Sequence, residues 1–254
     1  MPPADYSVLD TPDISMNSFY PRQAWTSTPT GAEDHSIAVQ EEVALSCRFF
    51  PVELEDPTIL FFYGNGETAV DYDGIAPLYN QVGVNFFVAD YRGYGNSGGS
   101  PAFSTMLSDA HKVLEALRMT LKKGGYSGPV FVMGRSMGRH AAFELAANSA
   151  DGVKGLIIES GRASLGQFAN GIDPSLAETL KAEYLDKVRS ITMPVLVIHG
   201  EVDTLAPVEG AVEMYDDFVS DQKRLVIIPG AGHNDLLHRG IEQYFVAIRD
   251  FVSP

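Results

Sequence analysis

Cysteine and basic residues are both scarce in this sequence of 254 residues. Cys47 is the only cysteine, so an internal disulfide cannot form, which is compatible with a reducing compartment. Lys and Arg together number 18 against 33 Asp and Glu, and the formal net charge is −15. Because nucleic acids and anionic membranes would repel such a chain, neither is expected as a partner.

Long apolar runs are absent as well. No stretch approaches the roughly 18 uninterrupted apolar residues that a membrane-spanning helix needs. The first residues, MPPADYSVLDTPDIS, are acidic and rich in proline, and they lack the apolar segment of a secretory signal. These absences predict a cytoplasmic protein with no membrane span. A monomer is expected.

A regular alternation of apolar runs and helical patterns fills most of the chain. Two short runs predict a β-hairpin over 36–50. Six more runs rich in β-branched residues predict strands at 58–64, 84–90, 129–134, 153–160, 194–200 and 224–230. Apolar residues at steps of three and four predict helices between them, most clearly over 104–123. The pattern indicates a mostly parallel sheet covered on both faces, and thus one α/β domain over 36–254 with residues 1–35 as an arm packed on it.

A serine lies between two glycines, at G-x-S-x-G spacing, in two places. The motif GRSMG at 134–138 directly follows a predicted strand and precedes a predicted helix. A nucleophilic serine at the end of a sheet needs this context, and Gly134 and Gly138 avoid the clash that side chains would cause there. The second motif, GNSGG at 95–99, is separated from the next helix by a polar loop. Ser136 is therefore the expected nucleophile, and Ser97 is not.

The pattern G-x-G-x-x-G, typical of dinucleotide binding, occurs at 93–98 after a predicted strand. It requires a helix that opens on the last glycine and an acid at the end of the next strand. Here the helix begins later, and Glu115, at the right separation, lies inside that helix. A flexible loop is the preferred interpretation.

A serine hydroxyl becomes a strong nucleophile when a base takes its proton and a third group orients that base. In sheets of this kind the order along the chain is serine, acid, histidine. His233 is favoured as the base because it follows the run RLVIIPG in a Gly-rich loop, whereas His238 lies in the last predicted helix. Asp203 is favoured as the acid because it lies just beyond the strand at 194–200. Glu159, at the end of another strand, is the competing acid.

Attack on a carbonyl group develops negative charge on its oxygen, which calls for two N–H donors held in place beforehand. The backbone N–H of Met137, at the start of a helix, is the first candidate. The backbone N–H of Asn65, in the turn after ILFFYG, is the second, since Gly64 and Gly66 let the chain approach a substrate closely. The alternative is that GNG at 64–66 forms only a turn and has no part in binding the oxyanion.

Five segments together resemble the α/β-hydrolase superfamily: FFYGNGE, VADYRGYGNSGGSP, VMGRSMG, LVIHGEVDTLAP and IPGAGHND. They are most similar to the branch of BEM46-like proteins, serine-aminopeptidase-like esterases and acyl-protein thioesterases. The resemblance implies a mostly parallel, eight-stranded sheet with helices on both faces. The insertion of about thirty residues between IIESG and MPVLVIHG predicts a short cap at about 161–190. It also implies Ser136 as nucleophile, Asp203 as acid and His233 as base. Asn65 and Met137 would be the oxyanion donors.

The chain departs from that family at two places. Tyr63 stands where the family usually has histidine, and Arg139 and His140 stand where small residues usually follow the serine. The preferred interpretation turns both side chains off the helix into solvent or toward Glu144. In the alternative they reach the rim of the pocket and favour an anionic acyl substrate.

These features predict a serine hydrolase that cleaves an acyl ester or thioester of a small molecule, without a metal or an organic cofactor. The short cap predicts an open pocket suited to a short or medium acyl chain. A catalytically silent α/β-hydrolase module that binds a ligand or partner is the alternative from another class. A serine peptidase and a dinucleotide oxidoreductase are less favoured.

Overall fold

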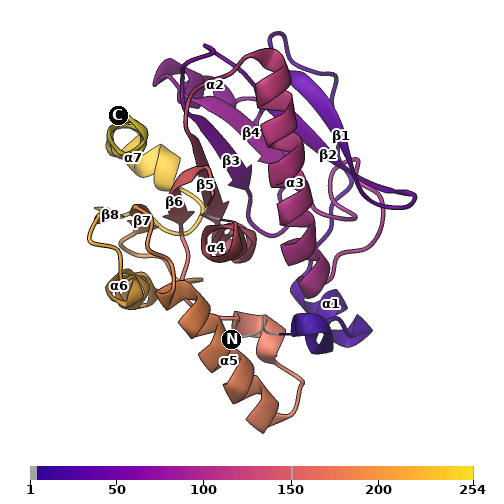
Figure 1. The fold of residues 1–254 in the computed structure, drawn as a ribbon. Coiled ribbons are helices and arrows are strands. Elements are labelled where there is room, and N and C mark those ends of the chain that lie inside the picture. Colours follow the sequence, from indigo (N-terminus) through magenta and orange to yellow (C-terminus); the bar gives the residue numbers. More distant parts are fainter. Residues whose placement is uncertain (1–4, 150, 254) are drawn as a thin grey trace.

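The apolar runs form one eight-stranded sheet in the computed structural model, which describes residues 5–149 and 151–253. The strands are β1 (Glu33–Gln40), β2 (Val43–Phe50), β3 (Thr58–Phe62), β4 (Asn85–Ala89), β5 (Val130–Arg135), β6 (Val153–Glu159), β7 (Val195–Gly200) and β8 (Lys223–Ile228). They lie in the order β1-β2-β4-β3-β5-β6-β7-β8 (Figure 1). Strand β2 is antiparallel to β1 and β4, and the remaining pairs are parallel. The predicted mostly parallel sheet is confirmed.

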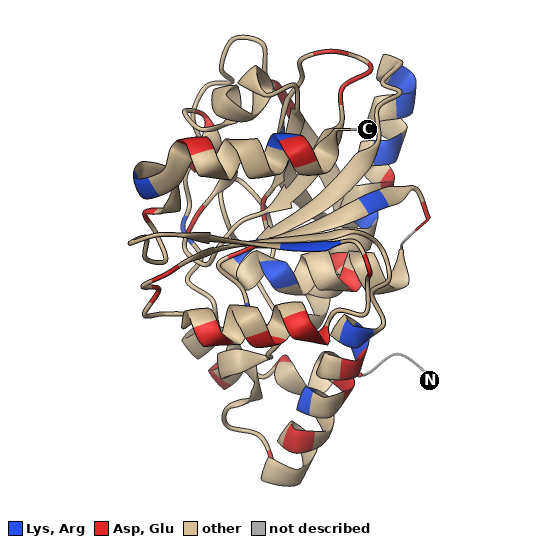
Figure 2. Cartoon of the chain, turned by 90° about the vertical axis from the view of Figure 1, so that its left-hand side faces the viewer, with Lys and Arg blue, Asp and Glu red and all other residues tan. Residues whose placement is uncertain are grey.

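Helices cover both faces of the sheet, as its apolar strands require (Figure 2). They are α1 (Pro12–Ser18), α2 (Ala76–Gln81), α3 (Phe103–Gly124), α4 (Arg139–Asn148), α5 (Pro174–Arg189), α6 (Val208–Asp217) and α7 (Leu236–Val252). On one face, Tyr79 of α2 stacks on Phe86 of β4 and contacts Phe245 of α7. Helices α3, α4 and α6 lie on the other. Within the described residues, no helix has the length and apolar character to cross a membrane.

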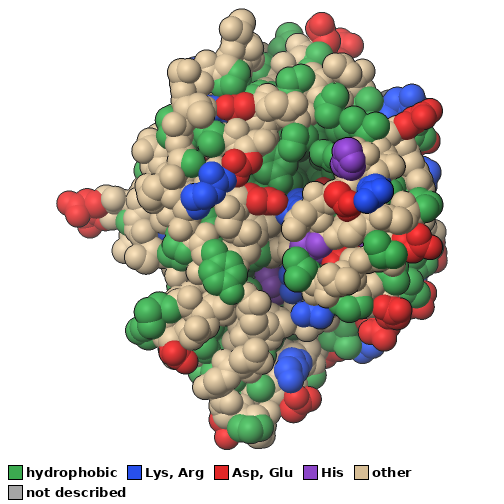
Figure 3. All heavy atoms as spheres, turned by 180° about the vertical axis from the view of Figure 1, so that it is seen from behind, with side chains coloured by type: hydrophobic (Ala, Val, Ile, Leu, Met, Phe, Trp, Pro, Cys, Tyr) green, Lys and Arg blue, Asp and Glu red, His purple; other side chains and the backbone are tan. Residues whose placement is uncertain are grey.

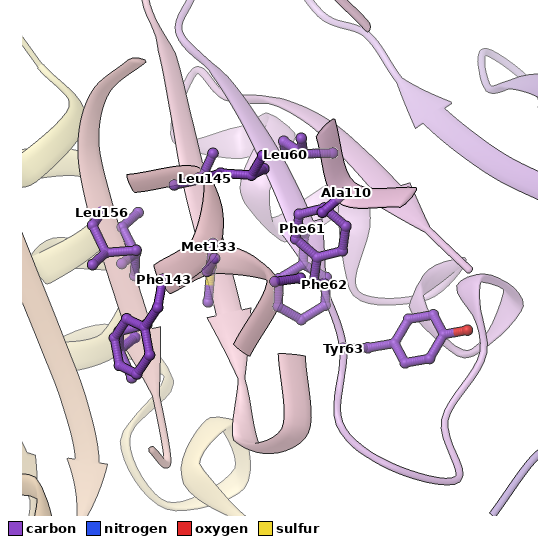
Figure 4. Close-up of a cluster of buried hydrophobic side chains, with 14 of the residues drawn as sticks. Leu60, Phe61, Phe62, Tyr63, Ala110, Met133, Phe143, Leu145 and Leu156 are labelled. Carbon is purple, nitrogen blue, oxygen red and sulfur yellow. The ribbon is translucent and has the colours of Figure 1, made fainter. Parts of the chain in front are cut away.

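The core is continuous across the central strands. Figure 4 shows the buried side chains of Leu60 on β3, Leu145 on α4 and Leu156 on β6, together with Met133 of β5, whose Sδ lies 3.8 Å from the Tyr79 hydroxyl of α2 on the other face of the sheet. These side chains are fully buried, and burial of each such side chain stabilises the fold by about 1.5–3 kcal/mol. This packing stabilises the central parallel strands, and these strands position the loops at their carboxyl ends.

The two segments predicted as arm and cap pack against each other and against the body. Phe168 lies between Phe19 and Phe103, with ring centroids 5.1 and 4.7 Å away. Of the apolar residues of α5, Leu180 and Tyr184 are buried, whereas Leu176 is exposed. How the chain divides into arm, domain and cap stays a prediction, but the contacts make one continuous core.

Glu144 of α4 links three helices. Its carboxylate lies 3.1 Å from Nε2 of His111 on α3 and accepts a hydrogen bond of 2.6 Å from Lys187 of α5. Burial alone would raise the pKa of Glu144, but the hydrogen bond with His111 and the charge of Lys187 lower it to about 2. The ionised carboxylate therefore stabilises the folded state at neutral pH.

Glu144→Gln is expected to lower the free energy of unfolding at pH 7 by about 2–3 kcal/mol. Because the folded pKa lies below the unfolded one, this contribution is complete above about pH 5 and is lost as the pH falls toward 2. Urea unfolding at pH 7 and pH 3 measures it. Glu178→Gln, on the exposed side of α5, is the control and should change stability little. An equal loss at both pH values would contradict the account.

Candidate active site

Ser136 lies at the sharp turn between β5 and α4, at the carboxyl edge of the sheet. Its φ of +51° is in the left-handed region, which non-glycine residues rarely adopt. A Cβ atom at Gly138 would lie 1.9 Å from the carbonyl oxygen of Phe62, and one at Gly134 would lie 2.6 Å from that of Gly138. Only glycine fits at either position. The turn leaves Ser136 partly exposed, with its hydroxyl at the surface of a pocket.

His233 and Asp203 lie beside that hydroxyl. The Nε2 atom of His233 is 2.9 Å from Oγ of Ser136, and its Nδ1 is 2.7 Å from Oδ2 of Asp203. The loop after β8 positions His233, and the loop after β7 positions Asp203. The structure thus brings together three side chains that are 97 and 30 residues apart along the chain.

The Asp203 side chain is completely buried, and its charge is matched by hydrogen bonds. Its Oδ1 accepts from the backbone N–H groups of Leu205 and Ala206, at 2.9 and 2.8 Å. Burial would raise the pKa of Asp203, but the hydrogen bonds from His233 and Ala206 hold it below its ordinary value. A carboxylate that stays ionised can fix the Nδ1–H tautomer of His233 and leave Nε2 free to accept a proton.

The competing candidates lie elsewhere. Glu159 pairs with Arg135 at 3.0 Å and accepts a hydrogen bond of 2.7 Å from Tyr244, and neither oxygen contacts His233. His238 is exposed on α7. Ser97 is buried, and its hydroxyl accepts a hydrogen bond from the backbone of Ser46 at 2.9 Å. Ser97 therefore has a structural contact, and its hydroxyl forms no hydrogen bond with a histidine of the described residues.

Asn65 and Met137 both line the pocket that holds Ser136. The Asn65 side chain is fully engaged away from it: Oδ1 accepts from Tyr94 at 2.6 Å and from the Tyr20 backbone at 2.9 Å, and Nδ2 donates to the carbonyl of Ser18 at 2.8 Å. These contacts hold the turn after β3 in place and use both the oxygen and the nitrogen of the amide side chain.

In the G-x-G-x-x-G segment, Gly95 lies against Asp90 and Gly93 lies near Pro21 of the N-terminal segment. A Cβ at Gly95, whose φ is +58°, would lie 1.9 Å from the Asp90 carboxylate. The N–H of Gly95 donates to the Arg22 carbonyl at 2.9 Å, so the N-terminal arm covers this loop.

Tyr63, the residue that departs from the family pattern, donates a hydrogen bond to the Asp90 carboxylate at 2.7 Å. Burial raises the pKa of Asp90 to about 6.

The pocket has a volume of about 410 Å³. Histidine and basic side chains gather in a hollow on the face of the molecule shown in Figure 3. Tyr20 and Leu205 line the pocket with side chains that are 58% and 65% exposed, so apolar surface meets solvent at its mouth. Among the described residues, no group of three or more His, Cys, Asp or Glu could hold a metal ion.

Comparison with known proteins identifies the family. Residues 55–182 and 176–238 match the model of the family described as serine aminopeptidase, S33. The chain is also 30% identical over 207 residues to the protein bem46 of Schizosaccharomyces pombe, covering 78% of this chain and 67% of the relative. The chain belongs to this family of α/β-hydrolases.

Other relatives and solved structures agree with that assignment. The human α/β-hydrolase domain-containing protein 17B is 30% identical over 77% of this chain and 66% of its own length. The esterase Pf2001 of Pyrococcus furiosus superposes with a TM-score of 0.72 at 23% identity, covering 92% of this chain and 97% of that one. Est1E of Butyrivibrio proteoclasticus, solved with ferulic acid, gives 0.71 at 22% identity over 85% and 97%. These structures share the α/β-hydrolase fold.

Arg135, inside the serine motif, connects the parts of the site of this hydrolase, although no motif in the sequence predicts that role. Its guanidinium pairs with Glu67 of the turn after β3 and with Glu159 of β6. Its Nη2 also donates to the His233 carbonyl at 3.0 Å and to the Asn234 side chain at 2.8 Å. The Arg135 side chain therefore links β5, the turn after β3 that contains Asn65, and the loop after β8 that contains His233. The sequence offered one signal for this role, because Arg135 is a charged residue at the end of an apolar run that predicts a buried strand.

The preferred interpretation of Arg139 and His140 was wrong, because neither points to solvent or to Glu144. They are 8% and 1% exposed, and both line the pocket. Nδ1 of His140 is 2.6 Å from the Tyr184 hydroxyl. Burial and the charge of Arg139 hold the pKa of His140 well below its ordinary value, so the ring is neutral. The loop after β6 and helix α5 enclose both side chains.

Proposed function

We propose that this α/β-hydrolase is a serine hydrolase that cleaves an acyl ester or thioester through an acyl-enzyme intermediate. One observation carries the proposal: the two ring nitrogens of His233 lie within hydrogen-bonding distance of Ser136 on one side and of Asp203 on the other. That arrangement is what a hydroxyl nucleophile requires for activation. The strained backbone of Ser136 and the adjacent pocket support the same assignment.

In the first half of the reaction, Oγ of Ser136 attacks the substrate carbonyl carbon while His233 Nε2 takes the hydroxyl proton. Asp203 accepts the Nδ1–H bond and stabilises the imidazolium. The tetrahedral intermediate collapses as the bond to the alkoxide or thiolate breaks, and Nε2 returns the proton to that leaving group. The acyl group remains esterified to Ser136.

In the second half, His233 removes a proton from water, which attacks the acyl carbon. Collapse releases the carboxylic acid, and the proton returns to Oγ of Ser136. The backbone N–H groups of Met137 and Asn65 are the proposed donors to the oxyanion in both halves. Each such donor contributes about 10²–10³-fold to kcat. His233 accepts and returns the proton in each of these steps.

The bond that is cleaved distinguishes this proposal from its alternatives. The matched family is described as serine aminopeptidase, so a peptide bond is the natural comparison. Three substrates with the same butyryl group (an aryl ester, an aryl thioester and an anilide) separate the classes. We expect kcat/KM for the ester and thioester to exceed that for the anilide by at least about 10²-fold.

Other results would overturn the proposal. Faster cleavage of the anilide than of the ester would favour a peptidase. Folded protein that hydrolyses none of the three would favour the silent binding module, and saturable binding of NADPH would favour the oxidoreductase. A monomeric state and a cytoplasmic location stay predictions from the sequence.

A further inference from the structure

The pocket of Ser136 is positively charged within an acidic protein. Three arginines line it, Arg135, Arg139 and Arg162, against one lining carboxylate, Glu67. The chain as a whole has a formal charge of −15. A basic hollow in such a chain attracts anions locally, because fields concentrate in clefts with low-dielectric walls.

Two of these three charges have no counter-ion among the described residues. Arg135 is neutralised by Glu67 and Glu159. Arg139 instead donates only to backbone carbonyls, those of Arg162, Ser136 and Ser164, at 2.7 to 2.9 Å. Those bonds use three of its five N–H groups. The half-buried Arg162 guanidinium forms no hydrogen bond or ion pair with any described side chain or carbonyl.

The two unmatched guanidiniums converge on one place. The position that a Cβ at Gly166 would occupy lies 3.6 Å from Nη2 of Arg162 and 3.7 Å from Nη2 of Arg139. Burial is the main cause that lowers the pKa of Arg139; Tyr184 opposes it, and the positive charge of Arg162 adds to it. Two positive charges that both lie within 4 Å of one position repel each other, and an anion between them would offset that repulsion. A planar carboxylate offers two oxygens to two guanidinium edges.

Unused polar atoms lie at the same pocket. The side chains of His140 and Ser160 are each 1% exposed and line it, and Nε2 of one and Oγ of the other have no partner among the described residues. Buried polar groups are nearly always hydrogen-bonded in folded proteins. These two atoms are closed to solvent, and they make the lining beside the two unmatched cations polar, which suits a polar ligand better than a long alkyl chain.

We propose that the acyl group of the substrate carries a carboxylate, which binds between Arg139 and Arg162 while the scissile carbonyl lies at Ser136. Arg139 donates directly to the Ser136 carbonyl at 2.7 Å, so the anion site is close to the nucleophile. A short dicarboxylic half-ester or half-thioester, with a few carbons between its two carboxyl groups, meets both requirements. This inference rests on the proposed serine hydrolase activity.

Monoethyl glutarate and ethyl pentanoate, followed by titration of released acid, test it. Alkyl esters are chosen because activated half-esters of glutarate cyclise spontaneously. We expect the wild-type kcat/KM for monoethyl glutarate to be at least about tenfold higher than for ethyl pentanoate. Arg162→Gln should reduce that ratio at least fivefold, and Arg162→Lys should restore part of it.

Arg189→Gln is the matched control, since it removes one positive charge from the last turn of α5, where the half-exposed Arg189 side chain pairs with Asp217. It should leave the ratio unchanged. A wild-type enzyme that hydrolyses both esters equally well, or prefers ethyl pentanoate, would overturn the anionic-substrate proposal alone. So would an Arg162→Gln variant with the wild-type ratio. If the aryl butyryl ester is cleaved but neither ethyl ester is, the anionic-substrate proposal fails alone; if none of these esters is cleaved, the serine hydrolase proposal itself fails.

Discussion

Ser136→Ala is expected to lower kcat for an ester substrate by about 10⁶-fold. The variant loses the atom that forms the acyl-enzyme, and His233 then has no hydroxyl to activate. The pocket and the oxyanion donors are unchanged, so a small rate above that of water should remain. Stopped-flow and long-term assays with a chromogenic butyryl ester cover this range.

Ser97→Ala is the control for that experiment, because Ser97 belongs to the second G-x-S-x-G motif. Its hydroxyl bonds only to the Ser46 backbone among the described residues, so the variant should keep wild-type kcat even if its unfolding midpoint falls slightly. If Ser136→Ala keeps more than about one per cent of wild-type kcat, the assigned nucleophile is wrong.

Asp203→Asn is the second large effect: kcat should fall by about 10⁴-fold. The asparagine oxygen can still accept the N–H groups of Leu205 and Ala206, so the loop should hold its shape. Its NH₂ group, however, would face Nδ1 of His233 and force the ring into the tautomer with hydrogen on Nε2. That tautomer cannot accept the Ser136 proton.

Glu159→Gln separates the two acids that the sequence left in competition. Glu159 contacts Arg135 and Tyr244 but not His233, so its loss should reduce kcat less than Asp203→Asn does. Steady-state kinetics of both variants, with urea unfolding to verify that each is folded, gives the comparison. A larger loss of kcat in Glu159→Gln would make Glu159 the functional acid.

The sheet and the placement of the candidate site were predictable because both depend on local sequence. Runs of β-branched residues mark buried parallel strands, and such strands deliver their following loops to one edge. Ser136, Asp203 and His233 each follow a strand within a few residues. The three side chains therefore lie close together because the sheet topology brings the loops that carry them to one edge.

The surroundings of Arg139 could not be predicted in the same way. Its acceptors are carbonyls of residues 136, 162 and 164, and two of these belong to a loop more than twenty residues away. The spacing of apolar residues in the sequence gives no sign that the loop after β6 folds over the first turn of α4. Arg135 was missed for a related reason: its partners Glu67, Glu159 and Asn234 come from three separate segments. Buried charge networks depend on tertiary neighbours.

The most direct test of the central claim is to find which residue a serine-reactive probe modifies. Folded wild-type protein is treated with a fluorophosphonate and digested, and the modified peptide is identified by mass spectrometry. We expect one modification per chain, on Ser136, and none in Ser136→Ala. Modification of a different serine, or none on folded wild-type protein, would contradict the account.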